Sequence, residues 1–350
     1  MDVKLSSKMT TRRKETMSEA PTTIKVILVI LVLIVGACSS QPKAGREASP
    51  YSVHFVTVEK DVKLEVIDWG GSGKSLVLLA GGGNTAHIFD HFAPKLANEF
   101  HVYGITRRGF GASQFSSIEN ADRLAKDIIT VLDSMAIAEP VLAAHSIGGA
   151  EMNLVTSISP GRISALIYLE AGYPYAFSNE KGPTMQDFFN LSGPQPPSPQ
   201  EHNLTNFETL QNWDAETYGF RRPLSEFRQT WDSTAQGQPT RPRNFPGFAI
   251  FPTLLSNPRS NVVISLPSLV IFAVPHSREA WMVASADSNI RNQAEVYFSK
   301  IDDLTKKQAD VFEATVPSAK VIRMQGMHYI FLSNEMEVLN EIRRFIADIK

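Results

Sequence analysis

The sequence predicts an α/β fold, a mainly parallel, doubly wound sheet with an inserted, mostly helical cap. From Tyr51 onward, strand-like and helix-like segments alternate, which is typical of such a sheet. Several of the strand-like segments are short and wholly apolar, as expected for parallel strands buried on both faces. Between Gly172 and Pro267 this alternation stops, which indicates the insertion.

The first two strands are predicted from alternation of apolar and polar residues at 52–58 and 64–68, the pattern of an antiparallel hairpin. Apolar runs predict the remaining strands, at 76–79, 102–105, 141–144, 165–169, 269–274 and 321–324. Apolar residues at helical spacing predict the main helices, at 86–98, 121–135, 147–158, 294–314 and 334–349.

The segment that interrupts the alternation is proline-rich at first and then patchily helical and aromatic. It is too long to be a plain loop in a compact domain. We therefore predict a cap at residues 172–266, which divides the core into a first part at 51–171 and a second part at 267–350.

The N-terminal region predicts export. Basic residues precede an apolar run from Val26 to Val35, which is short for a membrane span but typical of a signal-peptide core. The run ends in Val-Gly-Ala-Cys-Ser-Ser, which resembles the lipobox of bacterial lipoproteins, with Cys38 as the lipidated residue. We expect a signal peptide at 1–37, a polar tether at 38–50 and a membrane-anchored protein on the periplasmic or cell-surface side. The alternative is an uncleaved anchor helix in which Cys38 is an incidental small apolar residue.

Composition argues against several classes of function. A net charge of −2 gives no electrostatic reason to expect a nucleic-acid partner, and no zinc-type Cys/His spacing appears. The segment 71–75, Gly-Ser-Gly-Lys-Ser, imitates a phosphate loop, but Asp68 stands where the first glycine is required and the segment precedes its strand. We therefore expect no metal, no organic cofactor and no bound nucleotide.

The strongest chemical signal is the segment 144–149, Ala-His-Ser-Ile-Gly-Gly, directly after a buried strand and directly before a helix. A nucleophile elbow needs this context, because the serine stands on a tight turn and small neighbours let the backbone bend. Ser146 is thus the candidate nucleophile, with Ala144 in place of the usual first glycine. The alternative is that Ser146 is only a helix N-cap.

Two backbone amides are candidates to stabilise a negatively charged oxygen. The Ile147 amide stands at the start of the helix that follows Ser146, where a helix N-terminus favours negative charge. Gly82 would supply the second amide, from the glycine-rich loop after the strand 76–79. The alternative for this loop is a simple glycine-rich turn.

His328 is the candidate general base. It follows the last predicted strand, 321–324, and precedes the final helix, so its imidazole can reach a serine at the same edge of the sheet. It is the one histidine of eight with this placement.

An acid is also needed to orient His328. The chain order should be serine, acid, histidine, but the segment after strand 269–274, Val-Pro-His-Ser, has no carboxylate. Glu170 ends the preceding strand at the carboxyl edge of the sheet, where catalytic groups collect. We favour Glu170 over Asp287 or another downstream acid, and the plain alternative is a surface residue at a strand end.

These residues carry a resemblance to the α/β-hydrolase superfamily, over nearly all of Tyr51–Lys350. Segments 89–96 and 106–113 resemble the helix-to-loop signature of its esterase and epoxide-hydrolase-like branch. The chain departs from that branch with Ala80 before Gly81, where His-Gly is common, and with Thr106 where aspartate is common.

The resemblance implies an α/β-hydrolase fold with a cap. Epoxide hydrolases and haloalkane dehalogenases use an aspartate nucleophile, so Ser146 argues against both activities. Some dehalogenases place their acid after the sixth strand, which agrees with Glu170.

We predict a serine hydrolase that cleaves a carboxylic ester or related acyl bond of a small substrate through an acyl-enzyme. The aromatic cap favours a largely apolar substrate. The alternative function is that of a catalytically degenerate lipoprotein of the same fold that only binds its ligand, because the commonest acid position is empty and the oxyanion loop is altered.

Overall fold

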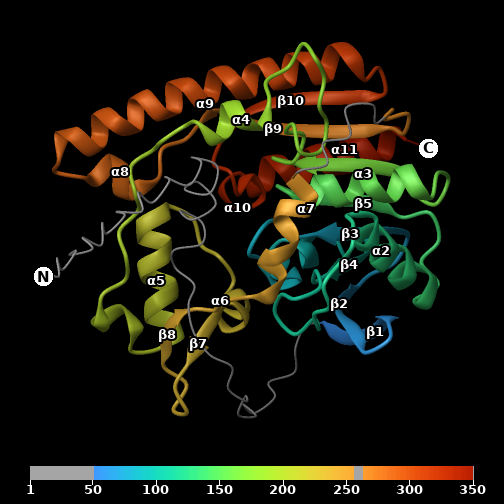
Figure 1. The fold of residues 1–350 in the computed structure, drawn as a ribbon, viewed down its shortest axis with the longest axis horizontal. Helices are drawn as coiled ribbons and strands as arrows, with labels where there is room; N and C mark the ends of the chain where they lie inside the picture. Colours follow the sequence, from blue (N-terminus) through green and yellow to red (C-terminus); the bar gives the residue numbers. More distant parts are fainter. Residues whose placement is uncertain (1–50, 256–262, 350) are drawn as a thin grey trace, which may run out of the picture.

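The computed structural model describes residues 51–255 and 263–349. They form one large sheet with helices on both faces and a second, mostly helical layer to one side (Figure 1). The predicted signal peptide, Cys38 and the tether lie outside the described residues. Within the described ranges, no helix has both the length and the apolar character of a membrane span.

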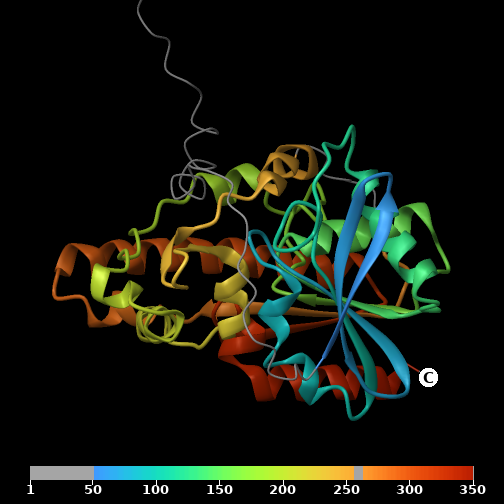
Figure 2. The ribbon, with the colours of Figure 1, turned by 90° about the horizontal axis from the view of Figure 1, so that it is seen from below.

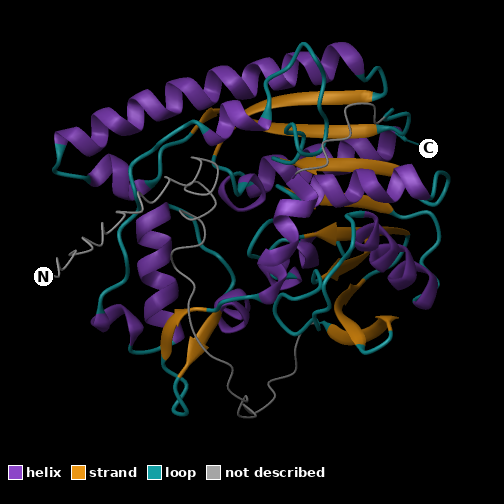
Figure 3. Cartoon of the chain, in the orientation of Figure 1, coloured by secondary structure: helices purple, strands orange, loops and turns teal. Residues whose placement is uncertain are grey.

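The sheet has eight strands in the order β1-β2-β4-β3-β5-β6-β9-β10. The strands are β1 Ser52–Glu59, β2 Val62–Gly70, β3 Lys74–Leu79, β4 Phe100–Ile105, β5 Val141–His145, β6 Ala165–Leu169, β9 Ser268–His276 and β10 Ala319–Gly326. β2 pairs antiparallel with both β1 and β4, and all later neighbours pair in parallel, which confirms the predicted hairpin and parallel strands (Figure 3).

The order of the strands decides where a site can form. The chain moves from β3 outward to β4 and then returns past β3 to β5. The carboxyl ends of β3 and β5 therefore flank the point where the strand order reverses, which is where open α/β sheets usually bind ligands.

Helices cover the two faces of the sheet, as Figure 2 shows with α11 in red on one side and α3 in green on the other. One face carries α2 Asp122–Ser134, α3 Gly148–Ile158 and the C-terminal part of α9 Ser288–Thr315. The other carries α10 Ile330–Ser333, α11 Glu335–Asp348 and the 3₁₀ helices η1 Ala86–Phe89 and η2 Ala93–Lys95. Each face has its own cluster of buried apolar side chains.

The predicted helix at 86–98 is wrong in type, because this segment forms η1 and η2 joined by turns. Thr85 caps η1 by accepting a hydrogen bond from the His87 amide, and Pro94 has no amide hydrogen to continue an α-helix. Ile88, Phe89 and Phe92 are nevertheless fully buried, so the apolar spacing reflects packing and not an α-helix.

The regular structure of the predicted cap segment is mainly helical, with long irregular stretches between the helices. It contains α4 Met185–Phe189, η3 Glu201–Leu204, α5 Phe207–Tyr218, α6 Leu224–Thr230, η4 Pro246–Ile250 and α7 Phe251–Leu255. It also contains a short hairpin that the sequence did not predict, β7 Trp231–Ser233 and β8 Pro239–Pro242. Helix α8, Ala280–Ala284, lies outside this segment but packs against α5 (Figure 1). The helical layer therefore contains chain from before and from after β9.

Candidate active site

Ser146 lies on the turn between β5 and α3, in the context that the sequence predicts. Its backbone is left-handed, with φ of 49°, a conformation that costs a non-glycine residue about 1 kcal/mol or more. The turn is tight: a Cβ on Gly149 would lie 2.4 Å from the carbonyl oxygen of Ala171. The methyl group of Ala144, which replaces the usual glycine, is fully buried without disrupting β5.

The structure brings Ser146, His328 and Glu170 together at one edge of the sheet. The Nε2 atom of His328 lies 3.0 Å from Ser146 Oγ, and its Nδ1 lies 3.2 Å from Glu170 Oε2. The three side chains follow β5, β10 and β6, so three strand ends hold them. Asp287, the other acid considered, is exposed and instead caps α9 by accepting a hydrogen bond from the Asn289 amide at 2.8 Å.

Glu170 is fully buried, so it is not a surface residue at a strand end. Its Oε1 accepts a hydrogen bond from the Ala273 amide of β9, and its Oε2 accepts one from the Tyr173 hydroxyl at 2.8 Å. Burial is the largest influence and raises the pKa of Glu170. The positive charges of His276 and His328, together with the hydrogen bond to His328, outweigh it and lower this pKa to about 2. The carboxylate is therefore charged at neutral pH.

His276 occupies the place at the end of β9 where the sequence lacks a carboxylate. Its Nδ1 lies 2.7 Å from Asp302 Oδ1, and its Nε2 lies 3.8 Å from Glu170 Oε2. Burial lowers the pKa of His276, but the hydrogen bond to Asp302 and the negative charges of Asp302 and Glu170 outweigh burial and raise it to about 9. A protonated imidazole thus lies between two carboxylates. No local pattern in the sequence indicates this pair, because Asp302 stands on α9, 26 residues further along.

His145 supports the loop that carries His328. Its Nε2 lies 3.0 Å from the backbone carbonyl oxygen of His328, and because a carbonyl only accepts, Nε2 donates. Burial, and then the charge of His328, lower the pKa of His145 to about 3, so the ring is neutral. Its Nδ1 faces Gly81, where a Cβ would approach to 2.6 Å. A glycine at position 81 is therefore required by the packing of His145.

Gly82 and Ile147, the two candidate donor residues, lie beside each other. A Cβ placed on Gly82 would be 3.7 Å from Ile147 Cγ2, so the loop after β3 contacts the start of α3. The backbone hydrogen bonds found between described residues include none donated by either amide. Both amides are thus available to a ligand, and the Ile147 amide stands at the positive end of α3.

The cap is tied to the loop that follows Gly82. Glu226 of α6 is buried and accepts hydrogen bonds from the side chain of Asn84 at 2.9 Å and from the amide and hydroxyl of Thr85. Burial raises the pKa of Glu226 above its ordinary value. The Tyr329 hydroxyl donates to Asn84 Oδ1 at 3.0 Å, which links this loop to the residue after His328. Cap, loop and histidine are therefore held as one unit.

Aromatic side chains from η4 and α7 cover the same loop. Atoms added at Gly82 and Gly83 would contact the rings of Phe251 at 3.3 Å and Phe248 at 3.6 Å. The proposed donor is therefore next to an apolar wall. Within residues 51–255 and 263–349, no group of acidic, histidine or cysteine side chains has the arrangement of a metal site.

Residues 76–341 match the Alpha/beta hydrolase family. This chain belongs to that family. Methylesterase 9 of Arabidopsis thaliana is 30% identical over 105 residues, which cover 29% of this chain and 41% of that protein. A pimeloyl-[acyl-carrier protein] methyl ester esterase of Aliivibrio salmonicida is 24% identical over 280 residues, 79% of this chain and 93% of that protein.

Several curated relatives are matched over less than half of their own length, methylesterase 9 among them. The fold of this α/β hydrolase is shared with solved structures. The crystal structure of E-2-(acetamidomethylene)succinate hydrolase has a TM-score of 0.57 and 16% identity, and the match covers 85% of this chain and 99% of that one.

Proposed function

We propose that this α/β hydrolase is a serine esterase that cleaves a carboxylic ester or related acyl bond of a small, largely apolar substrate. The observation that carries the proposal is the continuous series of contacts from Ser146 Oγ through both nitrogens of His328 to the buried Glu170. Two relatives named as methyl ester esterases or methylesterases support the ester bond as the target.

In the first half of the proposed reaction, Ser146 Oγ attacks the substrate carbonyl carbon while His328 Nε2 takes its proton. The carbonyl oxygen becomes negatively charged and is held by the amides of Gly82 and Ile147, each such donor typically worth about 10²–10³ in rate. Glu170 stabilises the imidazolium that forms on His328. The tetrahedral intermediate then collapses, and His328 returns the proton to the leaving alcohol.

In the second half, water replaces the alcohol. His328 Nε2 accepts a proton from the water as its oxygen attacks the acyl group on Ser146, and the same two amides hold the second oxyanion. Collapse returns the proton to Ser146 and releases the carboxylic acid. The aromatic wall beside Gly82 favours an apolar group on one side of the scissile bond.

The alternative, a binding protein of the same fold, predicts a serine without an activating base. The carboxylate within hydrogen-bond reach of His328 favours the enzyme, since a degenerate site has no need to keep a buried charge in that position.

The test is fluorophosphonate labelling of the full-length chain in detergent micelles, together with hydrolysis of p-nitrophenyl esters of increasing acyl length. We expect wild type to be labelled, Ser146→Ala to be unlabelled and inactive, and His328→Ala to be labelled far more slowly. Ser157→Ala is the matched control, because that serine is exposed near the far end of α3. A folded wild type that takes no label and cleaves no ester would refute the proposal.

We also propose that the chain is exported and anchored to a membrane by a lipid on Cys38. The support is the sequence alone: the basic residues, the apolar run and the small residues before the only cysteine. In a bacterial host, wild type should incorporate an alkyne fatty acid and fractionate with membranes, and Cys38→Ser should lose the label. Membrane fractionation without any lipid label would instead support an uncleaved anchor helix.

A further inference from the structure

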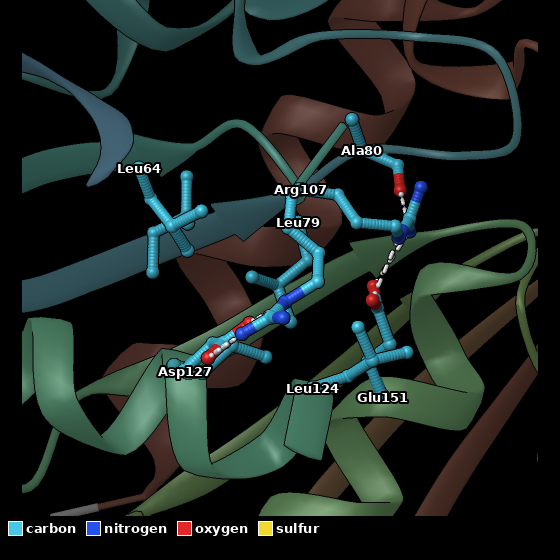
Figure 4. A pocket seen from close by; sticks show the side chains of 10 residues that line it. Leu64, Leu79, Ala80, Arg107, Leu124, Asp127 and Glu151 are labelled. Carbon is cyan, nitrogen blue, oxygen red and sulfur yellow. Dashed lines mark hydrogen bonds and ion pairs between the residues drawn. The ribbon is translucent and has the colours of Figure 1, made fainter. Parts of the chain in front are cut away.

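Arg107, in the loop after β4, extends into the space between the loop after β3 and α3 (Figure 4). Its guanidinium is buried and donates to both carboxylate oxygens of Glu151, from Nε at 2.6 Å and from Nη2 at 2.5 Å. The same guanidinium donates to two backbone carbonyl oxygens, from Nη2 to Ala80 at 2.8 Å and from Nη1 to Gly81 at 3.2 Å. One side chain thus connects α3 to two consecutive peptide groups of the glycine-rich loop.

These contacts determine which way the next amide points. In a trans peptide group the carbonyl oxygen and the amide hydrogen lie on opposite sides. Because the Gly81 carbonyl points toward Arg107, the amide of Gly82 in the same peptide group must point away from Arg107. That amide is the donor without a partner described above.

The loop needs such a constraint because it holds three glycines in a row, residues 81–83. Glycine has more backbone freedom than any other residue, and each residue fixed costs about 1 kcal/mol or more of conformational entropy. Gly81 cannot be replaced by a stiffer residue, because a Cβ there would meet His145 Nδ1 at 2.6 Å. Within the loop, the Gly81 carbonyl accepts one hydrogen bond, from the Asn84 amide at 3.4 Å. Arg107 adds a shorter one from outside the loop, at 3.2 Å, and a second at 2.8 Å to the preceding carbonyl of Ala80.

We propose that Arg107 is a positioning residue that aims the Gly82 amide at the oxyanion of the transition state. The inference rests on the proposed esterase function and deepens it. Glu151 fixes the guanidinium plane through two hydrogen bonds, and the rings of Phe110 and Phe251, 5.7 and 5.8 Å from the guanidinium carbon, flank it.

The neighbouring residue offers a matched control. Arg108 is also fully buried and makes a two-hydrogen-bond pair with Asp127, but its only backbone contact in the described chain is with the Ser116 carbonyl. A cavity of about 20 Å³ lies between the two ion pairs (Figure 4). Loss of Arg108 thus removes buried ion-pair contacts, with Asp127 and also with Glu59, without releasing the Ala80 and Gly81 carbonyls.

The test compares Arg107→Met, Arg107→Lys and Arg108→Met in the full-length chain, with active sites counted by complete fluorophosphonate labelling. Per labelled site, Arg107→Met should lower kcat for a p-nitrophenyl ester about 10²-fold with KM within about 3-fold, the effect of losing one oxyanion donor. Arg107→Lys should recover part of this loss, because the lysine ammonium can donate to one carbonyl. It lacks the planar fork of arginine, so it cannot bind both carbonyls and Glu151 at once. Arg108→Met should unfold more easily yet keep its kcat per site.

A second readout separates positioning from packing. The inhibition constant of a trifluoromethyl ketone, which forms a tetrahedral oxyanion on Ser146, should rise in Arg107→Met by about the factor by which kcat falls. Wild-type kcat per site in Arg107→Met would overturn the inference while leaving the esterase proposal intact. If Arg107→Met does not fold, Arg107→Lys is measured in its place. Wild-type kcat per site together with wild-type inhibition by the ketone in Arg107→Lys would then overturn the inference. Absence of activity in wild type would refute the esterase proposal itself.

Discussion

Replacing Glu170 by glutamine tests the acid of the proposed triad, Ser146, His328 and Glu170. The change keeps the size of the side chain but removes its negative charge. In the wild type, Glu170 Oε2 lies 3.2 Å from His328 Nδ1 and is fully buried, whereas the His328 side chain is 47% exposed. The charge of Glu170 matters most in the transition state, when His328 carries the serine proton.

The magnitude follows from that distance. Two unit charges 3.2 Å apart attract by about 5 kcal/mol at an effective dielectric constant of about 20. The exposure of His328 screens the pair, and we halve the figure to about 2.5 kcal/mol. That corresponds to about 10²-fold in kcat, since each 1.36 kcal/mol is about tenfold. Glutamine can also donate to Nδ1 and favour the wrong tautomer of His328, which would enlarge the loss.

The assay is kcat and KM for a p-nitrophenyl ester at pH 7.5, with sites counted by fluorophosphonate. Asp287→Asn is the matched control, because asparagine also caps helices and Asp287 is the acid that the sequence left as an alternative. We expect about 1% of wild-type kcat for Glu170→Gln and unchanged kcat for Asp287→Asn. A Glu170→Gln enzyme within threefold of wild type would refute this reasoning, as would a large loss in Asp287→Asn.

The other predictions concern the residues packed behind the triad. Gly81→Ala should lower kcat at least tenfold, because its Cβ would lie 2.6 Å from His145 Nδ1 and displace the ring that holds the His328 carbonyl; wild-type kinetics together with wild-type thermal stability would contradict this. The folded-state pKa of His276 is about 9, above the ordinary 6.5, so its proton stabilises the fold below pH 6.5, and this contribution is lost as the pH rises through 9. In urea unfolding, the free energy of unfolding of wild type should fall between pH 6.5 and pH 9, and this fall should be about 3 kcal/mol smaller in His276→Gln. Equal slopes in the two proteins would exclude His276 as the source.

Much of the fold could be predicted because its signals are local. Apolar runs and alternation locate every strand of the main sheet, since a buried strand and a half-exposed strand differ in sequence over a few residues. The position of Ser146 after β5 and of His328 after β10 follows from the same strand assignments. The segment 86–98 shows the limit of this method, because a 3₁₀ helix and an α-helix bury residues at similar spacing.

The supporting contacts of the site could not be predicted, because they join residues that are distant in the chain. Arg107 and Glu151 are 44 positions apart, and His276 and Asp302 are 26 apart. Glu151 is a charged residue in a segment that is otherwise mostly apolar, which is a sign of a buried ion pair but does not name the partner. Asp302 stands among other charged residues of its segment, so the sequence around it lacks even that sign. Only the packing of α3 and α9 on the sheet brings the partners together.

The absence of a carboxylate after β9 is explained by the order of the strands. β9 lies between β6 and β10, so an acid at the end of either β6 or β9 can reach a histidine that follows β10. Glu170 does so across β9, with its Oε1 held by the Ala273 amide of that strand. Its left-handed backbone, φ 52°, turns the chain sharply after β6, as Ser146 does after β5. The position left without an acid holds His276, whose positive charge faces the same carboxylate and offsets the cost of burying it. The acid therefore follows β6 instead of β9, and the positive charge of His276 lies beside its negative charge.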